Sequence, residues 1–186
     1  MRTRLLLLTD RAQLSKGRSL SRTIADCADA GLEAVVVREH DLGPRDRRAL
    51  LDRLTEIDGL TVISSRMPDP AAHGVHLAAH QPAVPGLHGR SCHWADDVRR
   101  AAAEGAAWAT LSPYAATASK PGHGPPLPPD AFAQGVDIPV FALGGIGPGN
   151  ARASVEAGAH GVAVMGVVMR AADPASVVAE LLEELG

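Results

Sequence analysis

Uninterrupted apolar runs alternate along this chain with longer stretches in which apolar and polar positions mix. Runs such as Leu5–Leu8 are typical of strands that are buried on both faces of a parallel sheet. In the stretch 44–57, by contrast, Leu50, Leu51 and Leu54 recur at helical spacing, which predicts an amphipathic helix. The pattern therefore predicts an alternation of strands and helices.

The strand-like runs cover residues 5–8, 34–37, 61–63, 74–77, 87–91, 107–111, 139–143 and 161–165. Helices are expected at residues 21–30, 44–57, 95–104, 130–134, 150–157 and 174–185. Because parallel strands need crossovers, this order predicts an α/β fold, a single compact (β/α)8 TIM barrel over residues 1–186. The third and fourth crossovers, at 68–72 and 82–86, are too short for proper helices. An open doubly wound sheet is the alternative fold.

The amino-acid composition argues against several classes of function. Apolar residues make up 46% of the 186 positions, which is enough for a sizeable core. Aromatic residues make up only 3%, and the formal net charge is −3, so we expect no nucleic-acid partner. No apolar run is long enough for a membrane span or a signal peptide. Cys27 and Cys92 fit no metal spacing and are expected to be free buried thiols, which favours a cytoplasmic protein.

Two apolar runs near the end of the chain finish in glycine. The first leads to Gly144 and Gly145, and the second leads through Met165 to Gly166. In barrels of this kind the loops after strands seven and eight often bind phosphate, because glycine lets backbone N–H groups approach an anion closely. We expect Gly144, Gly145, Met165 and Gly166 to hold a phosphate group, with packing glycines as the alternative.

Polar side chains follow the other strands, at the end of a barrel where active sites lie. Arg38, Arg66 and Lys120 would favour an anionic small molecule, and Ser91 and Thr117 are expected to bind it as well. His40, His80 and His93 are candidates for acid–base catalysis, because histidine titrates near neutral pH.

For several residues a structural role is the stronger expectation. His76 lies inside a strand and is expected to be a core histidine, and His123 is expected to be solvated. Arg38 could form an ion pair with Glu39, and Asp10 could cap a turn. The arginines of the second helix are expected on its solvated face: Arg45, Arg47 and Arg48.

Short blocks at the strand ends also carry a family resemblance. They are Leu8–Arg11, Val37–Glu39, Gly74–Leu77, Gly89–His93, Ser112–Pro113, Ala142–Ile146 and Gly161–Val164. In this order they resemble the blocks of the thiamine phosphate synthase and TenI family. The resemblance implies a (β/α)8 barrel, ligands of thiamin biosynthesis, and a thiazole phosphate at the last glycine turns. It also implies that Lys120 lies near a diphosphate, where we count it among the catalytic candidates.

The chain departs from the family pattern where the synthases bind Mg²⁺. The family has Asn-Asp before the arginine after strand three, and this chain has Ser64–Ser65–Arg66. The family has Gly-Gln-Glu-Asp after strand four, and this chain has Ala78–Gln81. Val36 and His40 replace a glutamine and a lysine of the family. Because Mg²⁺ needs carboxylate oxygens, we expect no metal or other cofactor unless the protein is a true synthase.

The TenI branch also lacks those aspartates and shares the Gly-Arg-Ser-x-His block of Gly89–His93. Its thiazole tautomerases transfer a proton without a metal, but their catalytic histidine is replaced here by Pro113. We therefore expect a TenI-like tautomerase that binds a small phosphorylated heterocycle and uses other histidines. The alternatives are a thiamine phosphate synthase and a non-catalytic ligand-binding barrel, and a homodimer is left open.

Overall fold

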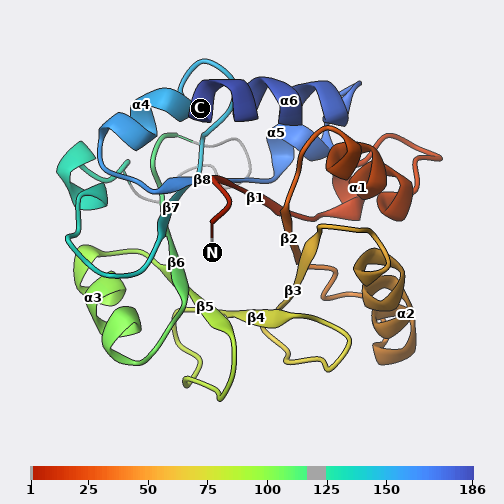
Figure 1. Ribbon diagram of the computed structural model, residues 1–186, viewed down its shortest axis with the longest axis horizontal. Coiled ribbons are helices and arrows are strands. Elements are labelled where there is room, and N and C mark those ends of the chain that lie inside the picture. The colour runs from red at the N-terminus through yellow and green to blue at the C-terminus, as the bar shows by residue number, and fades with distance from the viewer. Residues whose placement is uncertain (1, 117–124) are drawn as a thin grey trace.

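The computed structural model describes residues 2–116 and 125–186 and shows a closed barrel. The strands follow one another around the ring in the order β1 to β8, and β8 pairs with β1 to close it (Figure 1). Every neighbouring pair is parallel. The predicted (β/α)8 fold is confirmed, and the doubly wound alternative is wrong.

The strands are β1 (Leu5–Leu8), β2 (Ala34–Val37), β3 (Thr61–Ser65), β4 (Gly74–Leu77), β5 (His88–Cys92), β6 (Trp108–Leu111), β7 (Val140–Leu143) and β8 (Gly161–Val164). The α-helices are α1 (Leu20–Asp29), α2 (Pro44–Thr55), α3 (Ala95–Ala103), α4 (Ala151–Glu156), α5 (Gly166–Met169) and α6 (Pro174–Leu185). Two short 3₁₀ helices are η1 (Arg11–Gln13) and η2 (Pro129–Phe132).

The two shortened crossovers are confirmed. Neither the β3–β4 nor the β4–β5 connection contains a helix, and Figure 1 shows only loops outside the barrel between α2 and α3. Elsewhere the predicted elements agree with the structure to within a few residues, while η1 and α5 were not predicted. Within the described parts of the chain no helix is long and apolar enough to cross a membrane.

The core has two layers because successive residues of a strand face opposite sides. Leu5 and Leu7 of β1 pack outward against the helices. Leu6 and Leu8 point into the barrel, where they belong to a second cluster. That inner cluster consists of Leu6, Leu8, Ala34, Val36, Ile63, Trp108, Phe141 and Ala163. Continuous apolar strands are thus explained by burial on both faces.

Both cysteines lie in the outer core layer, as the sequence predicts. Cys27 on α1 and Cys92 on β5 are fully buried and free. Burial raises the pKa of each thiol to about 12, so both remain protonated at neutral pH.

Inside the barrel the Trp108 side chain lies over Gly89 of the neighbouring strand. The two residues are paired in register, and Trp108 is completely buried. A Cβ atom on Gly89 would lie 2.0 Å from a carbon of the indole ring. Gly89 is therefore required by packing rather than by a turn.

We expect Gly89→Ala to lower the free energy of unfolding by about 3 kcal/mol, since a fully buried ring has nowhere to move. Urea denaturation would measure this change. Gly43→Ser is the matched control, because Gly43 has open space around it and serine is favoured at the start of α2. A loss below about 0.5 kcal/mol for Gly89→Ala would contradict the packing argument.

Candidate functional site

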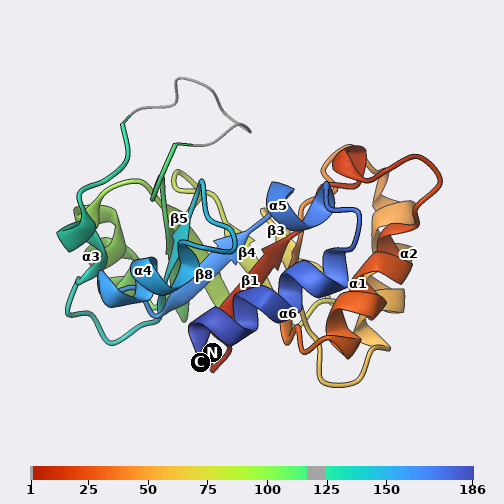
Figure 2. The same cartoon turned by 90° about the horizontal axis from the view of Figure 1, so that it is seen from above.

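The candidate site lies at the carboxyl ends of the strands. Figure 2 shows α5 toward the end of the barrel that is opposite the two chain termini. A short helix after β8 is a common part of phosphate sites in this fold, and α5 begins at Gly166, one of the predicted glycines.

The glycine pair after β7 has a demonstrable steric role. Gly144 and Gly145 both adopt left-handed conformations, with φ of 99° and 68°. The segment after β6 passes directly over them: Tyr114 N–H donates to the Leu143 carbonyl, and Ala115 N–H donates to the Gly144 carbonyl, each at 2.9 Å. A Cβ on Gly145 would lie 2.5 Å from the Ala116 carbonyl oxygen. The pair therefore joins the mouth loops of β6 and β7, whatever it also binds.

Two guanidinium groups flank the start of α5. Arg38, at the end of β2, reaches across the mouth and donates from Nη1 to the Sδ of Met165. Arg170 folds over Gly166, so that its Nη1 lies 2.2 Å from where a Cβ on that glycine would be. The first N–H groups of a helix have no partner within it and carry partial positive charge. Arg38, Met165 and Gly166 are thus brought together in a positively polarised corner.

A buried arginine underlies the ends of β2 and β3. Arg47 projects inward from α2 and is only 3% exposed. Its guanidinium donates to Ser64 Oγ at 2.9 Å, to the Val37 carbonyl at 3.0 Å and to the Ser65 carbonyl at 3.2 Å. Burial lowers the pKa of Arg47 from its ordinary value. The expectation of a solvated Arg47 is wrong; the neighbouring Arg48 is more exposed and pairs with Asp69 at 2.6 Å.

His40 lies beside this cationic region. Its Nε2 is 3.4 Å from Ser65 Oγ. Although the His40 side chain is exposed at the mouth, desolvation by the surrounding loops lowers its pKa below the ordinary 6.5, and the positive charges of Arg66, Arg38 and Arg47 lower it further. His40 is therefore neutral at pH 7, which leaves one ring nitrogen able to accept a proton.

The residues at the family's Mg²⁺ positions do not fit a magnesium ion. Ser65 stands where an aspartate would be, next to His40 and above the Arg47 guanidinium. Gln81 stands at the second position, and its amide is used to tie loops together: Oε1 accepts from Ala78 N–H at 2.8 Å and Nε2 donates to the Arg66 carbonyl at 2.9 Å. Among residues 2–116 and 125–186 no cluster of three or more potential ligands could hold a metal.

The first two mouth loops are joined by a charge cluster that sequence reasoning assigned differently. Glu39 is buried and accepts from Arg11, not from Arg38, with Nη1 to Oε2 at 2.9 Å. Arg11 also pairs with Asp41 at 2.5 Å. Hydrogen bonding to Arg11 lowers the pKa of Asp41. Asp10 caps η1 as expected, accepting from Ala12 N–H at 3.2 Å.

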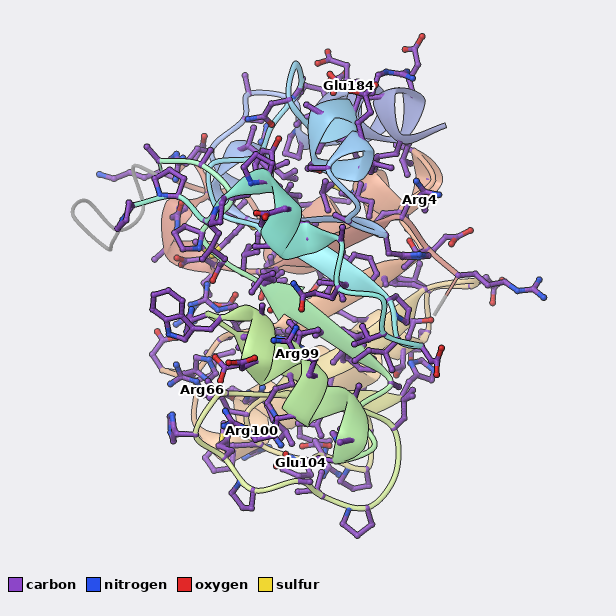
Figure 3. The ribbon with its side chains drawn as sticks, turned by 90° about the vertical axis from the view of Figure 1, so that its left-hand side faces the viewer. Arg4, Arg66, Arg99, Arg100, Glu104 and Glu184 are labelled. Atoms are coloured by element: carbon purple, nitrogen blue, oxygen red, sulfur yellow. The ribbon has the colours of Figure 1, made fainter. Side chains whose placement is uncertain are left out.

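Three further predicted residues, His80, Ser91 and His93, lie around β4, β5 and α3. A cavity of about 600 Å³ opens beside the helix-free β4–β5 connection and is lined in part by His80, Gln81, Ser91, Arg100 and Glu104. Figure 3 shows Arg100 and Glu104 on α3, at the end of the molecule where this connection runs. His80 is exposed there, away from the corner formed by Arg38 and α5.

His93 lies at the start of α3. Its Nδ1 is 3.3 Å from Ser112 Oγ, and its backbone N–H donates to Asp97 at 3.2 Å. It therefore contacts the loop after β6, some distance along the mouth from β2.

Arg90, which was not identified from the sequence, is a buried residue that holds the β4–β5 connection against α3. Its guanidinium donates to the carbonyls of Ala78 and Gln81 and to Glu104 at 3.3 Å. It ties the β4–β5 connection to α3 in place of the missing helix.

His76 is a satisfied core histidine, as expected. Trp108 Nε1–H donates to its Nδ1 at 3.1 Å, and its Nε2 lies 3.0 Å from Ser91 Oγ. Burial lowers the pKa of His76 to about 4, with Arg90 and Arg38 adding to the effect. Three further candidates, Thr117, Lys120 and His123, lie outside the described residues.

Comparison with known proteins agrees with this architecture. A family model described as thiamine monophosphate synthase matches residues 5–168. The thiamine-phosphate synthase of Haloarcula marismortui is 34% identical, with 91% of this chain and 90% of that protein covered. The thiamine-phosphate synthase of Roseiflexus castenholzii is 33% identical, with 90% and 82% covered. The solved structure of a thiamine phosphate pyrophosphorylase from Pyrococcus furiosus superposes with a TM-score of 0.85 over 98% of this chain and 95% of its own, at 21% identity.

The buried Arg47 gives a direct test of the site's framework. Arg47→Met keeps the apolar stem but leaves the carbonyls of Val37 and Ser65 without their donor, so we expect a loss of about 3 kcal/mol in unfolding free energy. Chemical denaturation would measure it. Arg45→Met, on the exposed face of the same helix, should change stability by less than about 0.5 kcal/mol. Equal effects of the two substitutions would show that Arg47 is not a structural donor.

Proposed function

The chain belongs to the thiamine monophosphate synthase family, and from this premise we propose that it acts on a phosphorylated thiazole in a reaction that uses no magnesium. The phosphate would lie at the start of α5, near Gly166 and between the guanidinium groups of Arg38 and Arg170. Gly144 and Gly145 would form the neighbouring wall.

The proposal that the reaction needs no metal rests on one observation. The Arg47 guanidinium is buried beneath the carboxyl end of β3 and donates a hydrogen bond to Ser64 Oγ. A buried positive charge there opposes a divalent cation, while Ser65 and Gln81 supply none of the negative charge that Mg²⁺ requires. The same positive charge favours an anionic substrate. Oxygens of a carboxylate or phosphate group could be held by Arg38 and Arg66 without a metal.

The reaction that this site supports best is proton transfer on the heterocycle. His40 is neutral and can accept a proton from the substrate at its free ring nitrogen, then return it to a different substrate atom. The nearby arginines would stabilise the negative charge that develops on the substrate between these two steps. This is isomerase chemistry of the tautomerase type, and it consumes no second substrate.

A second candidate is the coupling of a pyrimidine diphosphate with the thiazole phosphate. The identity of the two similar proteins favours it, since both are thiamine-phosphate synthases. In this reaction Arg38, Arg47 and Arg66 would offset the charge of the departing pyrophosphate. Pro113 after β6 agrees with it as well, because the tautomerase branch has its histidine there.

Two assays of the purified protein separate these reactions. In the first, conversion of a thiazole carboxylate phosphate is followed by NMR with and without EDTA. In the second, formation of thiamine phosphate from the two precursors is followed by chromatography with and without Mg²⁺. We expect isomerisation that EDTA does not alter. Thiamine phosphate formed only with Mg²⁺ would overturn the proposal, and binding without product in either assay would identify a non-catalytic barrel.

The role of His40 can be tested through the pH profile. Because its pKa lies below 6.5 and the neutral form is needed, the rate should stay constant down to mildly acidic pH and fall only below that value. His40→Asn should reduce the rate by about 100-fold or more and abolish the acid limb. His80→Asn serves as the control, because His80 is also an exposed histidine of the mouth but lies away from Arg38 and α5. An unchanged profile in His40→Asn would exclude His40 as the base.

A further inference from the structure

Three side chains form a continuous hydrogen-bonded line across the barrel interior. Trp108 of β6 donates from Nε1 to Nδ1 of His76 on β4, at 3.1 Å. The other ring nitrogen of His76, Nε2, lies 3.0 Å from Ser91 Oγ on β5. The line runs from the fully buried Trp108 to the half-buried Ser91, which lines the cavity beside α3.

The indole fixes the tautomer of His76. An indole N–H can only donate, so Nδ1 of His76 must present its lone pair to Trp108. A neutral imidazole carries its single proton on the other nitrogen, and Nε2 must then be an N–H donor. His76 is only 4% exposed, and this burial, with the charges of Arg90 and Arg38 adding to it, lowers its pKa to about 4, so the ring is neutral at physiological pH.

This tautomer decides what Ser91 can do. Ser91 Oγ accepts the Nε2–H of His76, so its own hydroxyl proton must point elsewhere. In the described part of the chain, His76 is the only side chain that forms a hydrogen bond with that hydroxyl. The pair is therefore not a nucleophilic Ser–His dyad, in which histidine would accept the serine proton.

We propose that His76, held by Trp108, is a positioning residue that commits the Ser91 hydroxyl to donate a hydrogen bond to an anionic oxygen of the substrate. The identity of that substrate rests on the proposed function, whereas the direction of the hydrogen bonds does not. A donor of fixed direction and zero charge adds selectivity for phosphate or carboxylate oxygens in a mouth already rich in guanidinium groups.

Thr110 provides a matched comparison. Its Oγ1 lies 3.3 Å from the same His76 Nε2. It is buried, at 1% exposure, so it cannot reach a ligand directly. Removing that hydroxyl leaves the Trp108–His76–Ser91 line intact.

The tautomer itself is measurable without any ligand. In ¹⁵N-labelled protein, long-range proton–nitrogen NMR should show a protonated Nε2 and an unprotonated Nδ1 for His76 at pH 7. Trp108→Phe removes the indole donor and should give a mixture of both tautomers. A protonated Nδ1 in the wild-type protein would overturn the proposal, and this measurement decides it even if Trp108→Phe fails to fold.

Binding of inorganic pyrophosphate, measured by calorimetry, tests the consequence. We expect Ser91→Ala to weaken binding about tenfold and Trp108→Phe to weaken it about threefold, while Thr110→Val leaves it unchanged. In the Ser91→Ala background, Trp108→Phe should cause no further loss, because its effect acts through Ser91.

An equal loss from Trp108→Phe with and without Ser91 would contradict the proposal, as would a wild-type protein that binds no pyrophosphate. These results do not depend on turnover. Inactivity in both enzymatic assays, together with the expected tautomer and binding pattern, would reject the proposed function and leave this inference standing.

Discussion

The interior volume of an eight-stranded parallel barrel is the constraint on which the rest of this structure depends. Such a barrel is just wide enough for side chains to fill. Here several inward positions are small, among them Ala34, Gly89 and Ala163, so large side chains must compensate for them. Trp108 and Phe141 do so and are both completely buried. Because the Trp108 ring also carries an N–H group, this buried ring needs a hydrogen-bond acceptor, and Nδ1 of His76 provides it.

The mouth above this core lacks carboxylates at the two positions where the family pattern has its metal-binding aspartates, which are Ser65 and Gln81 here. Carboxylates at the family's metal positions would attract a divalent ion, whereas this chain places Arg47 beneath Ser64 and Ser65. Within the described residues no carboxylate pairs with this buried guanidinium, and the Ser64 hydroxyl and two carbonyl oxygens accept its hydrogen bonds. This fixed positive charge favours anionic groups near the ends of β2 and β3.

Much of the fold could be predicted because buried parallel strands leave a plain signature. Runs such as Leu5–Leu8 and the glycine-ended turns located the barrel and its mouth, and the spacing of Leu50, Leu51 and Leu54 located α2. The same spacing, extended back by one turn, reaches Arg47, and that would have revealed its burial. The charge of the arginine side chain suggested that it would be exposed to solvent. A buried guanidinium is stable where several carbonyl groups accept its hydrogen bonds, and only the tertiary structure brings those carbonyl groups together.

Other parts of the site could not be foreseen for similar reasons. The pairing of Glu39 with Arg11 joins two loops that are far apart in sequence, and the local neighbour Arg38 was the natural but incorrect partner. The four-residue α5 is too short to show a helical period. The tautomer of His76 depends on a strand register that brings β4 beside β5 and β5 beside β6, and no local pattern specifies that register.

The helix-free side of the barrel has a dynamic consequence. Around most of the ring, helices seal the strands with apolar contacts, but the β4–β5 connection is fastened to α3 by the hydrogen bonds of Arg90. Fastening of this kind buries little apolar surface, and local opening costs less free energy where such burial is small. We therefore expect the β4–β5 side of the barrel, which adjoins Ser91, to open locally at a lower free-energy cost than the sides that are covered by helices.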